Sequence, residues 1–150
     1  MKYTNFDLSI DPLTEAGYPI RCASERRGEA RSLLPTADLE RPELQDALDR
    51  IDFRETDREL LKTLGADLYR LILRESVEKV FLEACGDCGD GGERGIRVRL
   101  RIEPPELAVY PWELIYCPHQ DCFLGTSIRT PLVRYLELHG RIQSLEHDLR

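Results

Sequence analysis

The stretch Ile96-Arg97-Val98-Arg99-Leu100-Arg101-Ile102-Glu103 (IRVRLRIE) decides the fold class of this 150-residue chain. Apolar residues fill its even positions and charged residues its odd positions. Successive side chains of a β-strand point to opposite faces of a sheet, so the pattern predicts a strand with one buried face and one charged face. Pro104-Pro105 then ends the strand, because proline has no N–H for pairing.

An N-terminal β-meander is expected over residues 1–35. The apolar residues of 3–10 alternate with polar ones, and residues 18–23 repeat this alternation after a turn that contains Pro and Gly. Residues 29–34 supply a third short strand. These three segments are close in sequence, which favours antiparallel pairing of neighbours.

The segment 36–84 carries helical patterns instead. Apolar residues recur at three- and four-residue intervals over roughly 39–51, and again from Asp57 to Ile72, so that each helix has one apolar stripe. Ser76 is the expected N-cap of a further short helix, because its hydroxyl can accept a bond from a free helix N–H. The middle of the chain is therefore expected to cover a sheet with helices.

A glycine-rich loop and a second run of strands complete an α/β (α+β) fold. Residues 85–95 hold five of the ten glycines, a density that excludes regular structure. The last segment, 96–150, begins with the strand quoted above. Further elements are predicted at 106–116 (a turn or short helix), 122–128 and 132–138 (strands) and 141–150 (a terminal helix).

The net negative charge of the chain bears on which kinds of molecule it can bind. The chain has 21 basic and 28 acidic side chains, which disfavours generic binding of nucleic acid or anionic membranes. Residues 38–90 alone carry eight basic and fifteen acidic side chains. This excess indicates either a solvated helical surface or an acidic docking face for a basic partner. Since no run of 18 apolar residues and no export signal is found, a cytoplasmic protein is expected.

Five cysteines form the clearest chemical pattern. Cys85 and Cys88 are separated by two residues, and Cys117 and Cys122 by four, with His119 inside the second pair. Four thiolates on two loops can close a tetrahedral zinc site. The alternative is that all of them are reduced, incidental thiols, as is usual for a chain without an export signal.

Two further features have a structural and a functional interpretation. The arginines at 97, 99 and 101 could bind a carboxylate-rich peptide, or they could pair with the acidic helices of the middle third. Trp112, the single tryptophan, is expected to be a buried anchor. Glu113 follows it in an apolar run and therefore needs an arginine or backbone N–H partner.

The run from Leu100 to Ala108 (LRIEPPELA) and the run from Tyr110 to Tyr116 (YPWELIY) resemble a stretch of the CHAT proteins, which are caspase-like cysteine peptidases associated with tetratricopeptide repeats. The segments at 123–127 (FLGTS) and 130–136 (TPLVRYL) resemble the strands that follow that stretch. Weaker matches extend the resemblance over roughly residues 5–138. Its most specific positions are Pro104, Pro105, Pro111, Trp112, Glu113 and Arg134.

The resemblance implies a caspase-like sandwich of bacterial origin, whose His–Cys dyad cleaves peptide bonds as a cysteine endopeptidase. In the family both catalytic residues lie downstream of the strand that matches 132–136, so no residue of this chain takes either role. His139-Gly140 resembles the catalytic His-Gly, but it stands where the family has a linker. No activity is expected from this chain alone.

Two functional hypotheses follow. The first is a non-catalytic scaffold or regulatory module of a CHAT peptidase, completed by a partner or a downstream half. Its incomplete sheet leaves an open edge and an exposed apolar face, so the chain is expected to associate with itself or with a chain that carries the missing half. The second is a stand-alone protein-interaction adaptor, stabilised by a structural zinc ion bound to Cys85, Cys88, Cys117 and Cys122. A third, less favoured hypothesis is direct activity through His139 and a cysteine.

Overall fold

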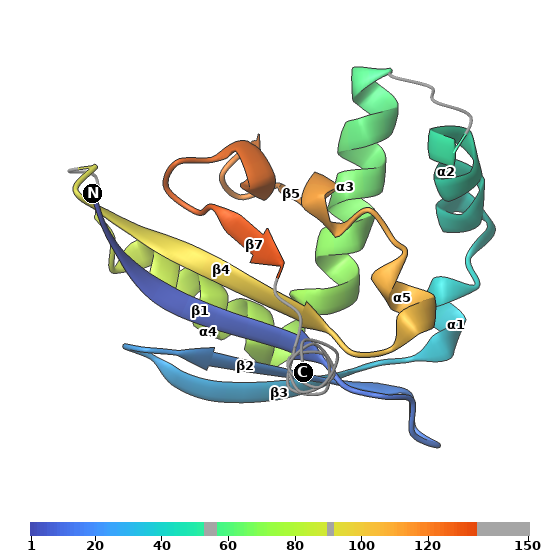
Figure 1. Ribbon diagram of the computed structural model, residues 1–150, viewed down its shortest axis with the longest axis horizontal. Helices are drawn as coiled ribbons and strands as arrows, with labels where there is room; N and C mark the ends of the chain where they lie inside the picture. The colour runs from blue at the N-terminus through green and yellow to red at the C-terminus, as the bar shows by residue number, and fades with distance from the viewer. Residues whose placement is uncertain (53–56, 90–91, 135–150) are drawn as a thin grey trace, which may run out of the picture.

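A five-stranded sheet forms the centre of the computed structural model, which describes residues 1–52, 57–89 and 92–134. The strand order is β3-β2-β1-β4-β7 (Figure 1). β1 pairs antiparallel with β2, and β2 with β3, whereas β4 is parallel to β1 and β7 is parallel to β4. The expected α/β class is confirmed. The strands are β1 (Lys2–Ile10), β2 (Tyr18–Ser24), β3 (Gly28–Leu34), β4 (Arg94–Ile102) and β7 (Leu132–Arg134).

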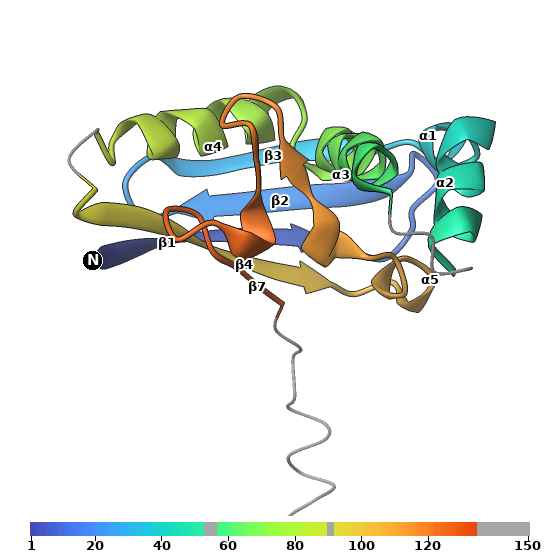
Figure 2. The same cartoon turned by 90° about the horizontal axis from the view of Figure 1, so that it is seen from above.

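Helices cover one face of this sheet. α4 packs against β3, β2 and β4, and Figure 2 shows α3 and α4 on the same side of the strands. A small hairpin of β5 and β6 packs with the 3-10 turn η1 against α3. No helix in the described part of the chain is long and apolar enough to cross a membrane. The elements are α1 (Thr36–Leu39), α2 (Pro42–Asp52), α3 (Arg58–Ile72), α4 (Glu75–Gly86), α5 (Pro105–Ala108), η1 (Trp112–Leu114), β5 (Tyr116–Cys117), β6 (Cys122–Phe123) and η2 (Leu124–Thr126).

The core lies between the sheet and these helices. All four apolar residues of the quoted strand are buried, as the alternation predicts. Phe6 of β1 stands opposite Val98 of β4, and its ring meets Phe81 of α4 edge-on at 5.3 Å between centroids. Period-two alternation in both parallel strands therefore produces one continuous apolar surface, which α4 covers.

The opposite face of the sheet is charged. The expectation of an exposed apolar face was therefore wrong. No helix of the described segments lies over this face, and it carries mainly arginines, with the exposed Val133 of β7 opposite Arg99. The large exposed apolar side chains are scattered, at Met1, Leu13, Val109, Ile128 and Val133. The physical reason is the same alternation, because a strand that buries its even residues presents its odd ones to solvent.

Local boundaries differ from the sequence patterns at several places. The helix expected over roughly 39–51 is divided into α1 and α2, and the loop expected over 85–95 is shorter, because α4 continues to Gly86 and β4 already begins at Arg94. Helix α4 begins at Glu75 after Arg74, so Ser76 is not its N-cap; its hydroxyl donates instead to the carbonyl oxygen of Arg31 at 2.7 Å. The strand expected over 122–128 ends at Phe123 and continues as η2. The predicted terminal helix at 141–150 and residues 135–138 of the last predicted strand lie outside the described residues.

Candidate functional site

Five arginines gather on the uncovered face of the sheet, and they are called the arginine face below. Three come from β4, and the strand pairing sets the other two, Arg21 of β2 and Arg31 of β3, directly opposite one another. The odd positions of three strands thus point to one side. The members of the arginine face are Arg21, Arg31, Arg97, Arg99 and Arg101.

Some members of the arginine face hold carboxylates of the sheet itself. Arg99 donates two hydrogen bonds to the carboxylate of Asp7 of β1, at 2.5 and 2.8 Å. Arg21 donates two to the carboxylate of Asp11, at 2.8 and 2.9 Å. Arg101 pairs with Glu103. These carboxylates belong to β1 and to the residues that follow β1 and β4, and not to the acidic middle third, which was one of the two alternatives open from the sequence.

Arg31 and Arg97 differ from their neighbours. Among the described residues, neither has a carboxylate within ion-pair distance. Arg97 lies over the ring of Tyr3, with its guanidinium carbon 5.2 Å from the ring centroid. Both side chains are exposed. An arginine that stacks on an aromatic ring keeps its N–H donors free for a planar acceptor such as a carboxylate.

A shallow cavity of about 230 Å³ lies between the arginines of the arginine face. Arg99 and Arg101 form its wall from β4, and Arg21 and Arg31 form the opposite wall. Asp7 and Glu29 lie in the same lining. Because guanidinium groups bind carboxylates bidentately, this cavity is suited to an acidic side chain of another molecule.

The fold brings the two cysteine pairs together. Cys85 and Cys88 lie at the end of α4, and Cys117 and Cys122 stand directly opposite one another in the β5–β6 hairpin. A second open cavity separates these two elements, and Cys85, Cys122 and His119 are in its lining. We call Cys85, Cys88, Cys117 and Cys122 the cysteine cluster.

Three thiols of the cysteine cluster, those of Cys85, Cys88 and Cys122, have a raised pKa. Burial, with a smaller contribution from the nearby thiols of the other three members, raises the pKa of Cys85 to about 12, against the lowering effect of a hydrogen bond with Gln120. Burial also raises the pKa of Cys88 and of Cys122. A cysteine nucleophile needs the opposite shift, because the thiolate is the reactive form.

The geometry of a bound metal is not formed in the structure. Across residues 1–52, 57–89 and 92–134, no three His, Cys, Asp or Glu side chains are arranged to hold an ion. Cys88 donates instead to the carbonyl oxygen of Ala84 at 3.6 Å, and Cys122 to Oε1 of Gln120 at 3.8 Å. All five cysteines are free thiols.

The tryptophan motif is structural. Trp112 is fully buried, and its Nε1–H donates to the carbonyl oxygen of Leu107 at 2.7 Å, so the expected anchor is confirmed. Pro104 is the residue before α5, and Pro105 is in its first turn, where a missing N–H costs little. Pro111 precedes η1 in the same way.

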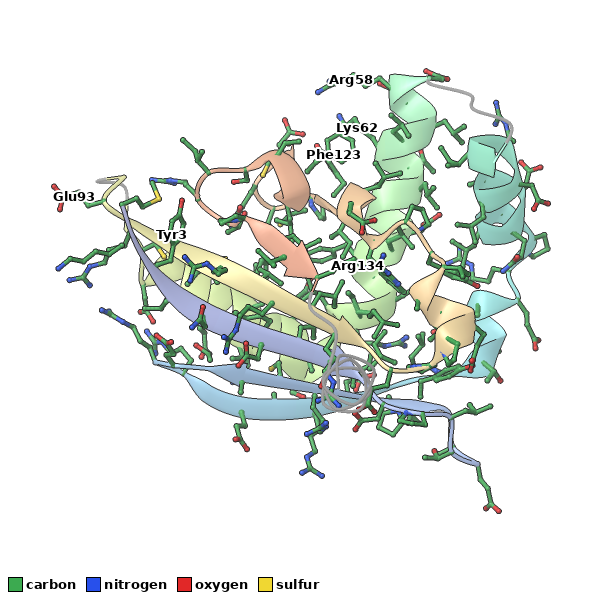
Figure 3. The ribbon with its side chains drawn as sticks, viewed as in Figure 1. Tyr3, Arg58, Lys62, Glu93, Phe123 and Arg134 are labelled. Atoms are coloured by element: carbon green, nitrogen blue, oxygen red, sulfur yellow. The ribbon has the colours of Figure 1, made fainter. Side chains whose placement is uncertain are left out.

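Glu113 finds the arginine partner that its sequence context requires. Arg134 at the end of β7 reaches it with Nη1 at 3.0 Å, and its Nη2 donates to the carbonyl oxygen of Ala108 at 2.6 Å. Figure 3 shows the Arg134 side chain between β7 and the α5 region. Glu113 is nevertheless exposed rather than enclosed by its apolar neighbours. The pair therefore links β7 to the turn that carries the tryptophan.

Several functional features escaped the sequence analysis. The partnership of Arg21 and Arg31 with the β4 arginines depends on the sheet order, which no local pattern encodes. The contact of His119 Nε2 with Glu78 Oε2, at 3.5 Å, also joins segments distant in sequence. His139, which was considered as a base, lies outside the described residues.

Comparison with protein-family models, with curated proteins and with solved structures found no match for this chain. The resemblance to CHAT peptidases therefore rests on the quoted residues alone, and the function has to be argued from the two sites described above.

Proposed function

We propose that this chain is a non-catalytic scaffold or regulatory module of a CHAT-type, caspase-like cysteine peptidase. The catalytic His–Cys pair lies, in this proposal, on a segment outside these 150 residues, on a partner or on the same polypeptide. The module acts in the cytoplasm by binding acidic protein surface over its arginine face. It binds neither nucleic acid nor membranes.

The uncovered arginine face is the observation that carries the proposal. The sheet is mixed, with β1, β2 and β3 antiparallel and β1, β4 and β7 parallel, and no helix of the described segments covers its arginine face. Exposed Arg31 and Arg97 have no carboxylate partner there, while Arg99 and Arg101 form part of a cavity wall. Positive charge around a cavity favours a partner that carries Asp or Glu.

The chemistry of the thiols supports a non-catalytic role. A nucleophilic cysteine is activated by a neighbouring base or a lowered pKa. The pKa of Cys85 stands far above neutral pH because of burial, and those of Cys88 and Cys122 are raised in the same way. These thiols therefore fit a packing role better than attack on a peptide bond.

The arginine face can be tested with a labelled oligoglutamate peptide and fluorescence anisotropy. We expect saturable binding that weakens as salt is added, because exposed charges are screened. The double variant Arg31→Glu, Arg97→Glu should lose about tenfold or more in affinity, which corresponds to ~1.4 kcal/mol.

Arg58→Glu is the matched control, because Arg58 is an exposed arginine at the start of α3 and not on the arginine face. It should bind the peptide as the wild type does. Equal loss in the control and in the double variant would contradict the proposal. Tighter binding of oligothymidylate than of oligoglutamate would contradict it as well.

A stand-alone adaptor is the second candidate function. The observation that favours it is that Cys85 of α4 and Cys122 of the hairpin line one cavity, although no three ligand side chains of the described residues are arranged to hold an ion. The two candidates differ in their partner. The scaffold requires a chain with a His–Cys pair, whereas the adaptor captures acidic segments without one.

A further inference from the structure

We propose that a groove between α2 and the turn after α5 binds a short segment of a partner protein in which a large apolar side chain is flanked by lysine or arginine. This groove is called the α2 groove below. It lies outside the arginine face and selects the opposite charge, so the inference goes beyond the scaffold function proposed above. The residues that line it are Gln45, Leu48, Asp49, Ile51, Val109, Tyr110 and Pro111.

The α2 groove is apolar on both of its walls. Leu48 and Ile51 of α2, each partly buried against the core, form one wall, and Val109 and Pro111 belong to the other. Figures 1 and 2 both show α2 and α5 at the same end of the sheet. The volume is about 240 Å³, below the ~300–1,000 Å³ that is usual for pockets of small molecules and cofactors. A space of this size accepts one large side chain of a protein segment, the kind of anchor that dominates binding energy at interfaces.

Val109 is held in solvent by the backbone around it. Its side chain is 80% exposed. Arg134 Nη2 donates to the carbonyl oxygens of Ala108 and Tyr110, at 2.6 and 3.5 Å, which lie on either side of this valine. The turn is thereby fixed with an apolar side chain at the rim of the groove. A partner that covers this side chain removes apolar surface from water, which favours binding.

The two walls are joined to each other and to the core. The ring of Tyr110 stacks on that of the fully buried Trp112, with 5.8 Å between centroids. Gln45 Nε2 donates to the carbonyl oxygen of Leu39 at 2.6 Å and to the hydroxyl of Tyr110 at 3.4 Å. The α2 groove is therefore formed before a partner arrives, and a preformed site has less conformational entropy to lose on binding.

The charge of the α2 groove selects a basic segment. Asp49 is the one charged group among the described residues of the lining, and the exposed Asp46 precedes it by three residues on the helix surface. Within residues 1–52, 57–89 and 92–134, neither carboxylate has a cationic side chain at ion-pair distance. Residues 38–90 as a whole carry eight basic and fifteen acidic side chains, which adds to the negative field. A lysine or arginine beside the apolar anchor is the complementary group.

Fluorescence anisotropy of the full chain with three labelled peptides tests the inference. The probe has one phenylalanine between two pairs of lysines (KKFKK). One control peptide has glycine in place of the phenylalanine, and the other has glutamine in place of each lysine. We expect saturable binding of KKFKK that weakens as salt is added, because exposed charges are screened, and much weaker binding of both control peptides.

Two variants separate the charge of the α2 groove from its apolar wall. Asp49→Lys and Val109→Ser should each weaken the binding of KKFKK about tenfold. Glu15→Lys is the matched control for charge, because it makes the same change at an exposed position between β1 and β2. Ile128→Ser is the matched control for apolar surface, because Ile128 is 76% exposed and is not in the lining. Both controls should bind as the wild type does, and circular dichroism verifies that each variant is folded.

Three results would overturn the inference. The first is the absence of saturable binding of KKFKK at concentrations up to about 1 mM. The second is an equal loss of affinity in Glu15→Lys and Asp49→Lys, which would reduce the effect to net charge. The third is equal binding of the glycine peptide, which would leave the apolar walls without a role. Val109→Ser should leave the binding of oligoglutamate unchanged, so failure of this inference and failure of the arginine-face proposal are distinguishable.

Discussion

Arg99 of β4 and Asp7 of β1 form a bidentate ion pair across two parallel strands. They stand opposite one another in the register, with Nε 2.5 Å from Oδ1 and Nη2 2.8 Å from Oδ2. The pair lies in the lining of the cavity on the arginine face. It occupies the carboxyl of Asp7, and this leaves the exposed Arg31 and Arg97 as the arginines available to a partner.

This pair should contribute little to stability. The side chains of Arg99 and Asp7 are 40% and 39% exposed, so solvent screens their attraction. A double-mutant cycle with Arg99→Ala and Asp7→Ala, followed by urea unfolding, should give a coupling of about 0.5–1 kcal/mol. A coupling above about 3 kcal/mol, which is typical of a buried pair, would mean that the face is covered in solution.

Gly65 of α3 should not tolerate a side chain. A Cβ built there would lie 2.2 Å from the carbonyl oxygen of Leu114 and 2.8 Å from the Cβ of Tyr116. Because the obstacle includes backbone, Gly65→Ala should cost about 1–3 kcal/mol in the free energy of unfolding. Gly86→Ala is the control, since nothing lies within 4 Å there, and it should be neutral or stabilising. Equal effects of both changes would contradict the close contact of α3 with η1.

The hydrogen bond of Trp112 should be measurable apart from its packing. Trp112→Phe keeps an aromatic ring but removes one of the donors to the carbonyl oxygen of Leu107, which also accepts from the N–H of Tyr110, and this loss should cost about 0.5–1.5 kcal/mol. Tyr110→Phe, which keeps the ring stacked on Trp112, should change stability by less than about 0.5 kcal/mol. Thermal and urea unfolding measure both. A Trp112→Phe variant as stable as the wild type would show that this bond contributes nothing.

The metal-free chain should lose stability at alkaline pH. The folded-state pKa of Cys85, about 12, lies above that of a free thiol, about 8.5. Between these values the unfolded chain has released a proton that the folded chain still holds, so the free energy of unfolding falls as pH rises. Cys85→Ser should make that fall shallower. Urea midpoints of chelator-treated protein across this range test it, and a stability independent of pH would contradict the burial of the thiol.

The strands were largely predictable, because their signal is local. Alternation in IRVRLRIE identifies β4 and its buried face without any knowledge of the partners, and the same holds for β1 and β2. The burial of Trp112 also followed from neighbouring residues, as did the expectation that Glu113 has a partner, either an arginine or a backbone N–H. In each case the chemistry of a few adjacent side chains was sufficient.

The remaining features depend on contacts that are distant in sequence. Ser76 fits the pattern of an N-cap, but its hydroxyl is used by β3, which lies 45 residues earlier. The strand expected over 122–128 breaks after Phe123, where Gly125 packs so close to the carbonyl of Glu113 that a Cβ would lie 2.8 Å from it. The pairing of Arg99 with Asp7 requires β1 and β4 to be neighbours, which only the assembled sheet reveals.

The most direct test of the scaffold function is the solution mass of the purified chain, measured by light scattering alone and with a CHAT-type chain that carries the His–Cys pair. We expect a stable complex with that chain, which Arg31→Glu with Arg97→Glu dissociates and Arg58→Glu does not. A chain that forms no complex, or a complex indifferent to reversal of the arginine face, would contradict the account.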